Sequence, residues 1–276
     1  MANIVTMALC RIKDNKKLEY NTATGADKTY TLYSSMLEIL AESADKYIQG
    51  DFEFEIIENE VDSYQEIFDT NFNEVYQMWD NGNNNVLFLD LDTLVINPVD
   101  VFDKLSDFQM FNYTDPKTLS GKDATNKYEL QHEHYFNAGV RYYPSSMKKE
   151  VWDLGWKYAN DWDYNVWGTE QIIFNEMMYS QDSDHTKWLT PEMNYQMMNA
   201  TPPALEQGQY ISQLNAWNGT SLNTSQIVHL HGTRGAEQTL LTQWALWKKL
   251  TGEEFEFDLV NVIQNNDGMP VGIEYK

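Results

Sequence analysis

Cysteine and basic residues are both scarce in this chain, and each scarcity narrows the possible functions. Cys10 is the only cysteine among 276 residues, so no disulfide can form within the chain, which suits a reducing compartment. Lysine and arginine total 19 against 42 aspartates and glutamates, a net charge of −23. So acidic a chain repels nucleic-acid phosphates and anionic lipid headgroups. We therefore expect no nucleic-acid binding and no basic membrane-binding patch.

Long hydrophobic runs are also missing. No stretch reaches the roughly 18 apolar residues of a membrane span, so we expect no membrane insertion. The first apolar run, Ile4 to Cys10, precedes the basic residues that begin at Arg11. A secretory signal peptide has the opposite order. These features together favour a cytoplasmic protein.

Aromatic and acidic side chains are plentiful. Aromatic residues make up 14% of the chain, with 9 Trp and 17 Tyr. This share is typical of a folded domain and is compatible with sugar binding, although any single ring is more often core filler. Most of the acidic residues are expected on the solvated surface. A nucleotide diphosphate would be repelled by this charge unless a cation intervened, so any phosphate site here favours a divalent metal.

The first third of the chain alternates between strand and helix patterns. Buried or alternating apolar runs predict strands at 4–10, 52–56 and 86–89, and apolar residues at helical spacing predict helices at 30–48 and 64–79. This order is typical of a parallel sheet with helices on its faces. A polar loop is expected at 11–28.

The remaining two thirds are mixed. We expect strands at 108–113, 135–143 and 225–230, helices at 147–158, 170–178 and 237–250, and a weakly alternating tail at 255–263. No repeat or low-complexity linker marks a boundary, so we expect a single domain over residues 1–276.

Asp90 and Asp92 follow the apolar strand at 86–89. In open parallel sheets, ligands bind at the carboxyl ends of the strands. Alternation around a buried Leu91 is expected to place both carboxylates on one side. Two such oxygen ligands suit Mg²⁺ or Mn²⁺, which usually completes its shell with substrate phosphates. The alternative is a solvated acidic strand end.

The same segment, Leu89 to Thr93, also matches the first motif of haloacid dehalogenase-like phosphatases. In those enzymes the first aspartate is a nucleophile and the second a general acid. Their motif normally follows the first strand of the fold. Here a strand–helix–strand–helix block precedes it, which counts against the phosphatase.

Four segments, at 86–95, 135–140, 170–175 and 229–232, together resemble the glycogenin-like family 8 of GT-A glycosyltransferases. Val86 to Val95 resembles the metal-binding motif of GT-A enzymes, and Tyr135 to Val140 looks like the donor-sugar segment of family 8. Glu170-Gln171 followed by Asn175 is similar to the family's Asp-Gln pair at a helix start, and His229 to Gly232 resembles its His-x-x-Gly motif. All four occur in the family's order and span most of residues 1–235.

The resemblance implies a fold and an activity. The fold would be α/β of the GT-A, Rossmann-like kind: a mostly parallel central sheet flanked by helices, with a nucleotide-binding half at 1–95 and a sugar and acceptor half, with the tail, at 96–276. The activity would be hexosyl transfer from a nucleotide sugar, a UDP-hexose, with retention at the anomeric carbon. The acceptor is not readable from the sequence.

The resemblance also implies roles for single residues. Asp90, Asp92 and His229 would hold Mn²⁺ or Mg²⁺, and a mixture of imidazole and carboxylates suits Mn²⁺. Gln171 would lie near the anomeric centre and Glu170 would contact donor-sugar hydroxyls. The donor would be bound by Ala8, Arg11, Leu91, Asn137, Ala138, Gly139, Gly232 and Arg234. The alternatives are structural roles. His229 would be a hydrogen-bonded histidine at a strand end, and Gly139 would only permit a tight strand.

Three departures from the family pattern keep alternatives open. The family's phosphate-binding lysine position is Gly235 here, with Arg234 one residue earlier as a possible substitute. Glu170 replaces an aspartate and could instead serve as a general base in an inverting reaction. Ala8 to Arg11 lacks the family's acidic residues, which leaves the base open. A GT-A-like domain that binds nucleotide or glycan without transfer is therefore the main alternative.

Overall fold

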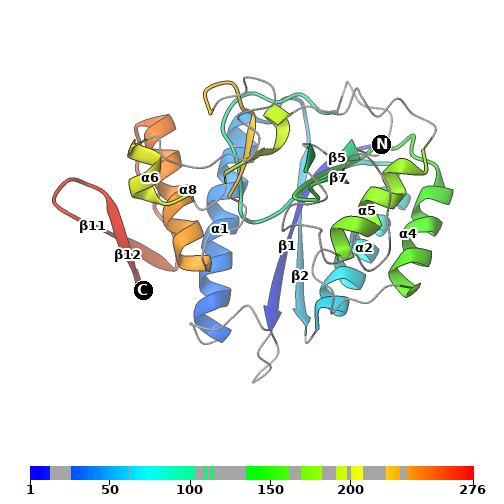
Figure 1. The fold of residues 1–276 in the computed structure, drawn as a ribbon, viewed down its shortest axis with the longest axis horizontal. Coiled ribbons are helices and arrows are strands. Elements are labelled where there is room, and N and C mark those ends of the chain that lie inside the picture. Colours follow the sequence, from blue (N-terminus) through cyan, green and yellow to red (C-terminus); the bar gives the residue numbers. More distant parts are fainter. Residues whose placement is uncertain are drawn as a thin grey trace.

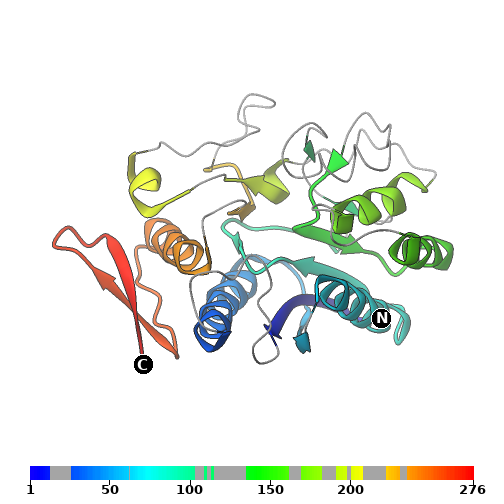
Figure 2. The same ribbon diagram turned by 60° about the horizontal axis from the view of Figure 1, so that its bottom comes forward.

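The structure is a computed structural model. It describes residues 1–12, 26–61, 63–102, 109–110, 113–114, 135–161, 169–181, 191–197, 200–207, 222–230 and 235–276. These residues form one mixed α/β domain around a five-stranded sheet (Figures 1 and 2).

The central sheet has the order β2-β1-β3-β8-β5. Its strands are β1 (Asn3–Ile12), β2 (Glu53–Val61), β3 (Asn85–Leu89), β5 (Gln109–Met110) and β8 (Val140–Tyr143). β1 pairs in parallel with β2 and β3, whereas β8 is antiparallel to its neighbours β3 and β5. One strand thus opposes the other four, and the predicted mostly parallel sheet is confirmed.

Helices cover both faces of this sheet, as Figure 1 shows. On one face lie α2 (Tyr64–Asp80), α4 (Lys149–Asp161) and α5 (Thr169–Tyr179), and on the other lies α1 (Ala26–Tyr47), with α8 (Ala236–Thr251) packed against it. Strand alternation explains the two cores. Val86 and Phe88 of β3 face α2 and α5, whereas Leu87 and Leu89 face α1.

A second, three-stranded sheet lies beyond the end of β3. It has the order β4-β10-β9, formed by β4 (Thr93–Val95), β10 (Ile227–His229) and β9 (Tyr195–Gln196). β10 is antiparallel to β4 and parallel to β9. The 3-10 helix η2 (Pro191–Asn194) leads into β9. This small sheet brings residues near 194 and 229 to the segment that follows β3.

Several predicted elements have different bounds. The single strand expected at 135–143 is wrong: β7 (Tyr135–Phe136) pairs with β6 (Tyr113–Thr114), and residues 137–139 separate it from β8. The helix α1 begins at Ala26, inside the polar loop expected at 11–28. The tail forms a hairpin of β11 (Val260–Gln264) and β12 (Pro270–Tyr275), and the short helix α6 (Pro202–Gln207) packs on α8.

Among the described residues, no helix combines the length and the apolar character that a membrane crossing requires.

Candidate functional site

The site is built around a tight turn between β3 and β4. The N–H and the hydroxyl of Thr93 donate to the carbonyl of Asp90, at 3.0 and 2.7 Å. The N–H of Asp90 donates to the carbonyl of Gly139 at 2.8 Å. From α8, the amide of Gln243 donates to the carbonyls of Leu91 and Thr93, each at 2.8 Å. This turn, and not strand alternation as predicted, holds the two carboxylates, and Leu91 is half-buried instead of buried.

His229 reaches this turn from the end of β10. Its Nε2 lies 3.1 Å from Oδ1 of Asp92, and its ring is buried. The N–H of Leu230 donates to the carbonyl of Asp92 at 2.8 Å, which fixes the two backbones together. One ligand atom each from Asp90, Asp92 and His229 lie within 4.8 Å of one another. The three predicted metal ligands therefore form one cluster.

The pKa values of two residues in this cluster, Asp90 and His229, are shifted from their ordinary values. Burial raises the pKa of Asp90 to about 7; the charge of Asp92 adds to the rise and Arg141 opposes it. Burial lowers the pKa of His229, but the carboxylates of Asp92 and Asp90 outweigh it and the pKa is raised. Both shifts show negative charge crowded into a poorly solvated place. Two carboxylates and one imidazole fit a divalent cation, which would relieve this repulsion.

A chain of buried amides continues from the histidine. Nδ1 of His229 lies 3.2 Å from Oδ1 of Asn194, and Nδ2 of Asn194 donates to Oδ1 of Asn137 at 3.0 Å. Nδ2 of Asn137 then donates to Oε1 of Gln171 at 3.2 Å. All four side chains are buried. Asn137 and Gln171 were predicted site residues, whereas Asn194 was not.

Gly139 lies directly against the imidazole. A Cβ atom built on this glycine would stand 2.3 Å from Cε1 and 2.5 Å from Nδ1 of His229. The close approach that requires glycine is thus made by the histidine ring. The neighbouring Ala138 is buried in the core beside α2 and α5, so its side chain does not face solvent.

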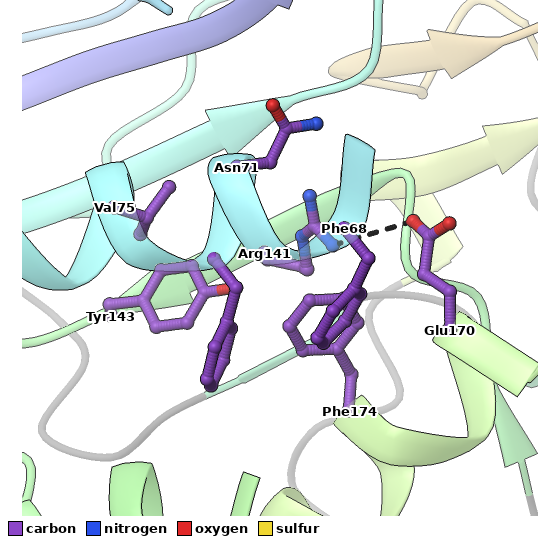
Figure 3. Close-up of a pocket in the computed structure, with 8 residues that line it drawn as sticks. Phe68, Asn71, Val75, Arg141, Tyr143, Glu170 and Phe174 are labelled. Atoms are coloured by element: carbon purple, nitrogen blue, oxygen red, sulfur yellow. Dashed lines mark ion pairs between the residues drawn. The ribbon is translucent and has the colours of Figure 1, made fainter. Parts of the chain in front are cut away.

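A buried arginine, not anticipated from the sequence, lies on the helix-covered side of the site. The guanidinium of Arg141 lies 4.0 Å from the ring centre of Phe88 and 4.2 Å from that of Phe174. Its Nη1 is 3.9 Å from Oε1 of Glu170, a carboxylate at the start of α5 whose side chain is 54% exposed (Figure 3). The adjoining cavity of about 10 Å³ has room for one water and not for a sugar. It is lined by Phe68, Asn71, Phe72, Val75, Arg141, Tyr143, Glu170 and Phe174.

The other predicted site residues are placed as follows. Ala8 and Arg11 lie in the second half of β1, beyond Thr6, which is the last residue of β1 that pairs with β3. Gly232 and Arg234 lie outside the described residues, and the structure says nothing of them.

Comparison with solved structures finds similar chains. No protein-family model and no curated protein matches the chain. The chain is similar to the crystal structure of a glycosyltransferase involved in the glycosylation of the major capsid of PBCV-1, with 13% identity over 85% of this chain and 96% of that one, and a TM-score of 0.44. At these values the likeness assigns neither a family nor an activity.

Proposed function

We propose that this protein is a metal-dependent glycosyltransferase that moves a hexose from a nucleotide-sugar donor, a UDP-sugar, to an acceptor. The observation that carries the proposal is the convergence of Asp90, Asp92 and His229 at the carboxyl end of β3, joined through buried amides to Gln171. The carboxyl end of a parallel sheet is where such folds bind ligands.

The metal ligands have a defined task in this proposal. Asp90, Asp92 and His229 would hold Mn²⁺, or Mg²⁺, against the diphosphate of the donor. When bound, such an ion supplies Lewis-acid stabilisation of the leaving nucleoside diphosphate. The three protein ligands come from the turn after β3 and from β10, so the binding geometry is fixed by two paired backbones.

The remaining site residues orient the donor. Gln171 would lie beside the anomeric centre and Glu170 beside the sugar hydroxyls, with retention of configuration. Asn137, Ala138 and Gly139 would support the sugar through their turn, whereas Ala8, Arg11 and Leu91 would contact the nucleotide and Gly232 and Arg234 the phosphates. The burial of Gln171 and the exposure of Glu170 support different tasks: the former holds a fixed orientation and the latter is accessible to a ligand.

The phosphatase alternative finds less support. The block β1–α1–β2–α2 precedes β3, the strand that Asp90 follows, whereas the phosphatase motif belongs to the first strand of its fold.

A donor-hydrolysis panel tests the proposal. UDP-, GDP- and other nucleotide sugars are incubated with Mn²⁺, with excess chelator, and with the variant Asp92→Ala. We expect hydrolysis of a UDP-sugar that chelation abolishes and that Asp92→Ala reduces by at least about tenfold, because one of few protein ligands is lost.

The matched control is Asp153→Ala, which makes the same charge change on an exposed position of α4. It should leave hydrolysis near the wild-type rate. Full activity in excess chelator would overturn the metal assignment. Metal-dependent binding of a nucleotide sugar with no hydrolysis or transfer would instead indicate a binding domain.

A further inference from the structure

We infer that Asn194 is a positioning residue that keeps a proton on Nδ1 of His229 and so presents Nε2 to a metal ion. The inference rests on the metal-binding part of the proposed function. It concerns a residue outside the predicted ligand set, and it follows from the order of donors and acceptors in the buried amide chain.

The orientation of each amide can be read from a backbone group. The N–H of Gly139 donates to Oδ1 of Asn137 at 2.9 Å. A backbone N–H can only donate, so the Asn137 atom that receives it is the oxygen. The Asn194 atom 3.0 Å from this oxygen must then be a donor, which is Nδ2. The other end of the same amide, Oδ1, therefore faces His229.

The imidazole nitrogen that faces Oδ1 of Asn194 must be a hydrogen-bond donor. Oδ1 of Asn194 accepts only, and it lies 3.2 Å from Nδ1 of His229. The matching form of the ring carries its proton on Nδ1. A neutral ring with that proton has its lone pair on Nε2, the nitrogen 3.1 Å from Asp92 and thus at the ligand cluster. Metal-binding histidines are commonly oriented in this way by a partner on their other nitrogen.

The backbone holds Asn194 in register with its target. Asn194 ends η2, and β9 follows at once. In the pairing of β9 with β10, Gln196 lies opposite His229, and the N–H of Met197 donates to the carbonyl of His229 at 2.8 Å. Asn194 is fully buried, with an exposed fraction of 0%. Its amide is therefore fixed relative to the ring it contacts.

The same chain fixes the predicted catalytic amide. Because Oδ1 of Asn137 is taken by Gly139 and Asn194, its Nδ2 points to Oε1 of Gln171, at 3.2 Å. Oε1 of Gln171 therefore faces Asn137, and Nε2 of Gln171 points away from it. The metal ligand and the predicted catalytic residue thus share one set of hydrogen bonds, and a change at Asn194 should reach both.

Nuclear magnetic resonance of the wild-type ring gives the first test. The protein is labelled with ¹⁵N in its histidines, and His229 is assigned by comparison with His229→Gln. With Mg²⁺ alone at saturation, we expect a hydrogen-bonded proton on Nδ1 and none on Nε2. A ring protonated on Nε2 under these conditions would overturn the inference. This test needs no substitution of Asn194.

Calorimetric titration of Mn²⁺ alone, without donor, gives the second test. Asn194→Ala removes the acceptor and should weaken Mn²⁺ binding by roughly tenfold to a hundredfold. Asn194→Asp keeps an oxygen facing Nδ1 but loses the donor to Asn137, so it should recover part of that loss. If Asn194→Ala binds Mn²⁺ as wild type and keeps the Nδ1 proton signal, the inference is wrong.

Asn175→Ala is the matched control. Asn175 is equally buried, but its side-chain amide hydrogen-bonds the backbone of Phe136 and Gln171 instead of His229. It should lower the unfolding temperature and leave Mn²⁺ affinity unchanged; an equal loss of affinity would mean that Asn194 acts only through general loosening. A protein that binds Mn²⁺ and shows the Nδ1 proton but hydrolyses no donor would contradict the transferase proposal and leave this inference standing.

Discussion

At the scale of single residues, Gly139 shows how closely the backbone approaches the proposed metal ligand His229. A methyl group at this position would stand 2.3 Å from Cε1 of His229. The ring is buried and cannot swing into solvent, so the ring or the backbone of residue 139 must shift within the site. We expect Gly139→Ala to fold but to bind Mn²⁺ at least about tenfold more weakly in calorimetric titration, because ligand geometry governs metal affinity.

A second glycine in a tight place provides the control for this prediction. A Cβ atom on Gly155 in α4 would stand 2.6 Å from Sδ of Met177 and 2.6 Å from Cζ of Phe72. Gly155→Ala should therefore strain the core on the α2–α5 side while Mn²⁺ affinity stays at the wild-type value. Wild-type affinity in Gly139→Ala as well would show that the imidazole is not a ligand.

At the scale of elements, the pair of β8 and α5 carries Arg141 and Glu170. Arg141→Met removes the positive charge but leaves an apolar side chain between the rings of Phe88 and Phe174. The exposed carboxylate of Glu170 remains hydrated by solvent. We expect an unfolding temperature within a few degrees of wild type, because buried ions can often be replaced by apolar side chains at little cost. Donor hydrolysis should fall as far as in Glu170→Gln.

A double-mutant cycle measures whether the two residues act together. If Arg141 serves by orienting Glu170, the double variant should lose little more in kcat than either single variant. Lys148→Met, an exposed cation just before α4, controls for the change in charge. Losses that add in the cycle would show that Arg141 acts independently of Glu170.

The sequence predicted long elements and the ligand cluster well. Apolar periodicity identified α2, α8 and β3, and the order of motifs predicted that His229 would join Asp90 and Asp92. It did not predict β4 or β9, which are too short for any periodicity. The role of Asn194 depends on pairing between distant strands and leaves no local pattern. A lone Arg141 between Val140 and Tyr142 was a visible sign of a buried charge.

At the scale of the whole molecule, the net charge of −23 should govern nucleotide binding. A diphosphate entering an acidic site needs a compensating cation, so UDP affinity should fall strongly without Mn²⁺. Arg234→Ala should reduce it by a further factor of about ten or more, since a charge-assisted contact to phosphate is typically worth about 1.5–3 kcal/mol. Calorimetric titration of UDP into both proteins, with and without Mn²⁺, measures this. Equal affinities would mean that Arg234 does not take the place of the phosphate-binding lysine of family 8 glycosyltransferases.

The crowded carboxylates should also make stability depend on pH. The pKa of Asp90 is raised from its usual 3.8 to about 7, so in this window the folded chain holds a proton that the unfolded chain has released. This contribution to stability falls as the pH rises from about 4 to 7. The pKa of His229 is raised too, and the stability from its charged ring is lost as the pH rises through that pKa. Both shifts have the same sign.

Thermal unfolding in chelator should therefore show a midpoint that declines from pH 5 to pH 8. Asp90→Asn should flatten the decline, since the neutral amide has no proton to lose. Mn²⁺ should raise the midpoint more at pH 8 than at pH 5, because it competes with protons for the same ligands. A decline of the same steepness in Asp90→Asn would place its cause elsewhere in this acidic chain.

The position of His229 on β10 also determines when the ligand cluster can form during synthesis and folding of the chain. Asp90 and Asp92 leave the ribosome long before β10, and the imidazole meets them only when β10 pairs with β4. Closing so long a loop comes late in folding, since its entropy must be offset by contacts formed beforehand. A nascent chain that stops short of β10 offers two carboxylates and captures the ion weakly. We therefore expect metal binding to slow the unfolding of the folded protein. We do not expect it to nucleate folding during translation.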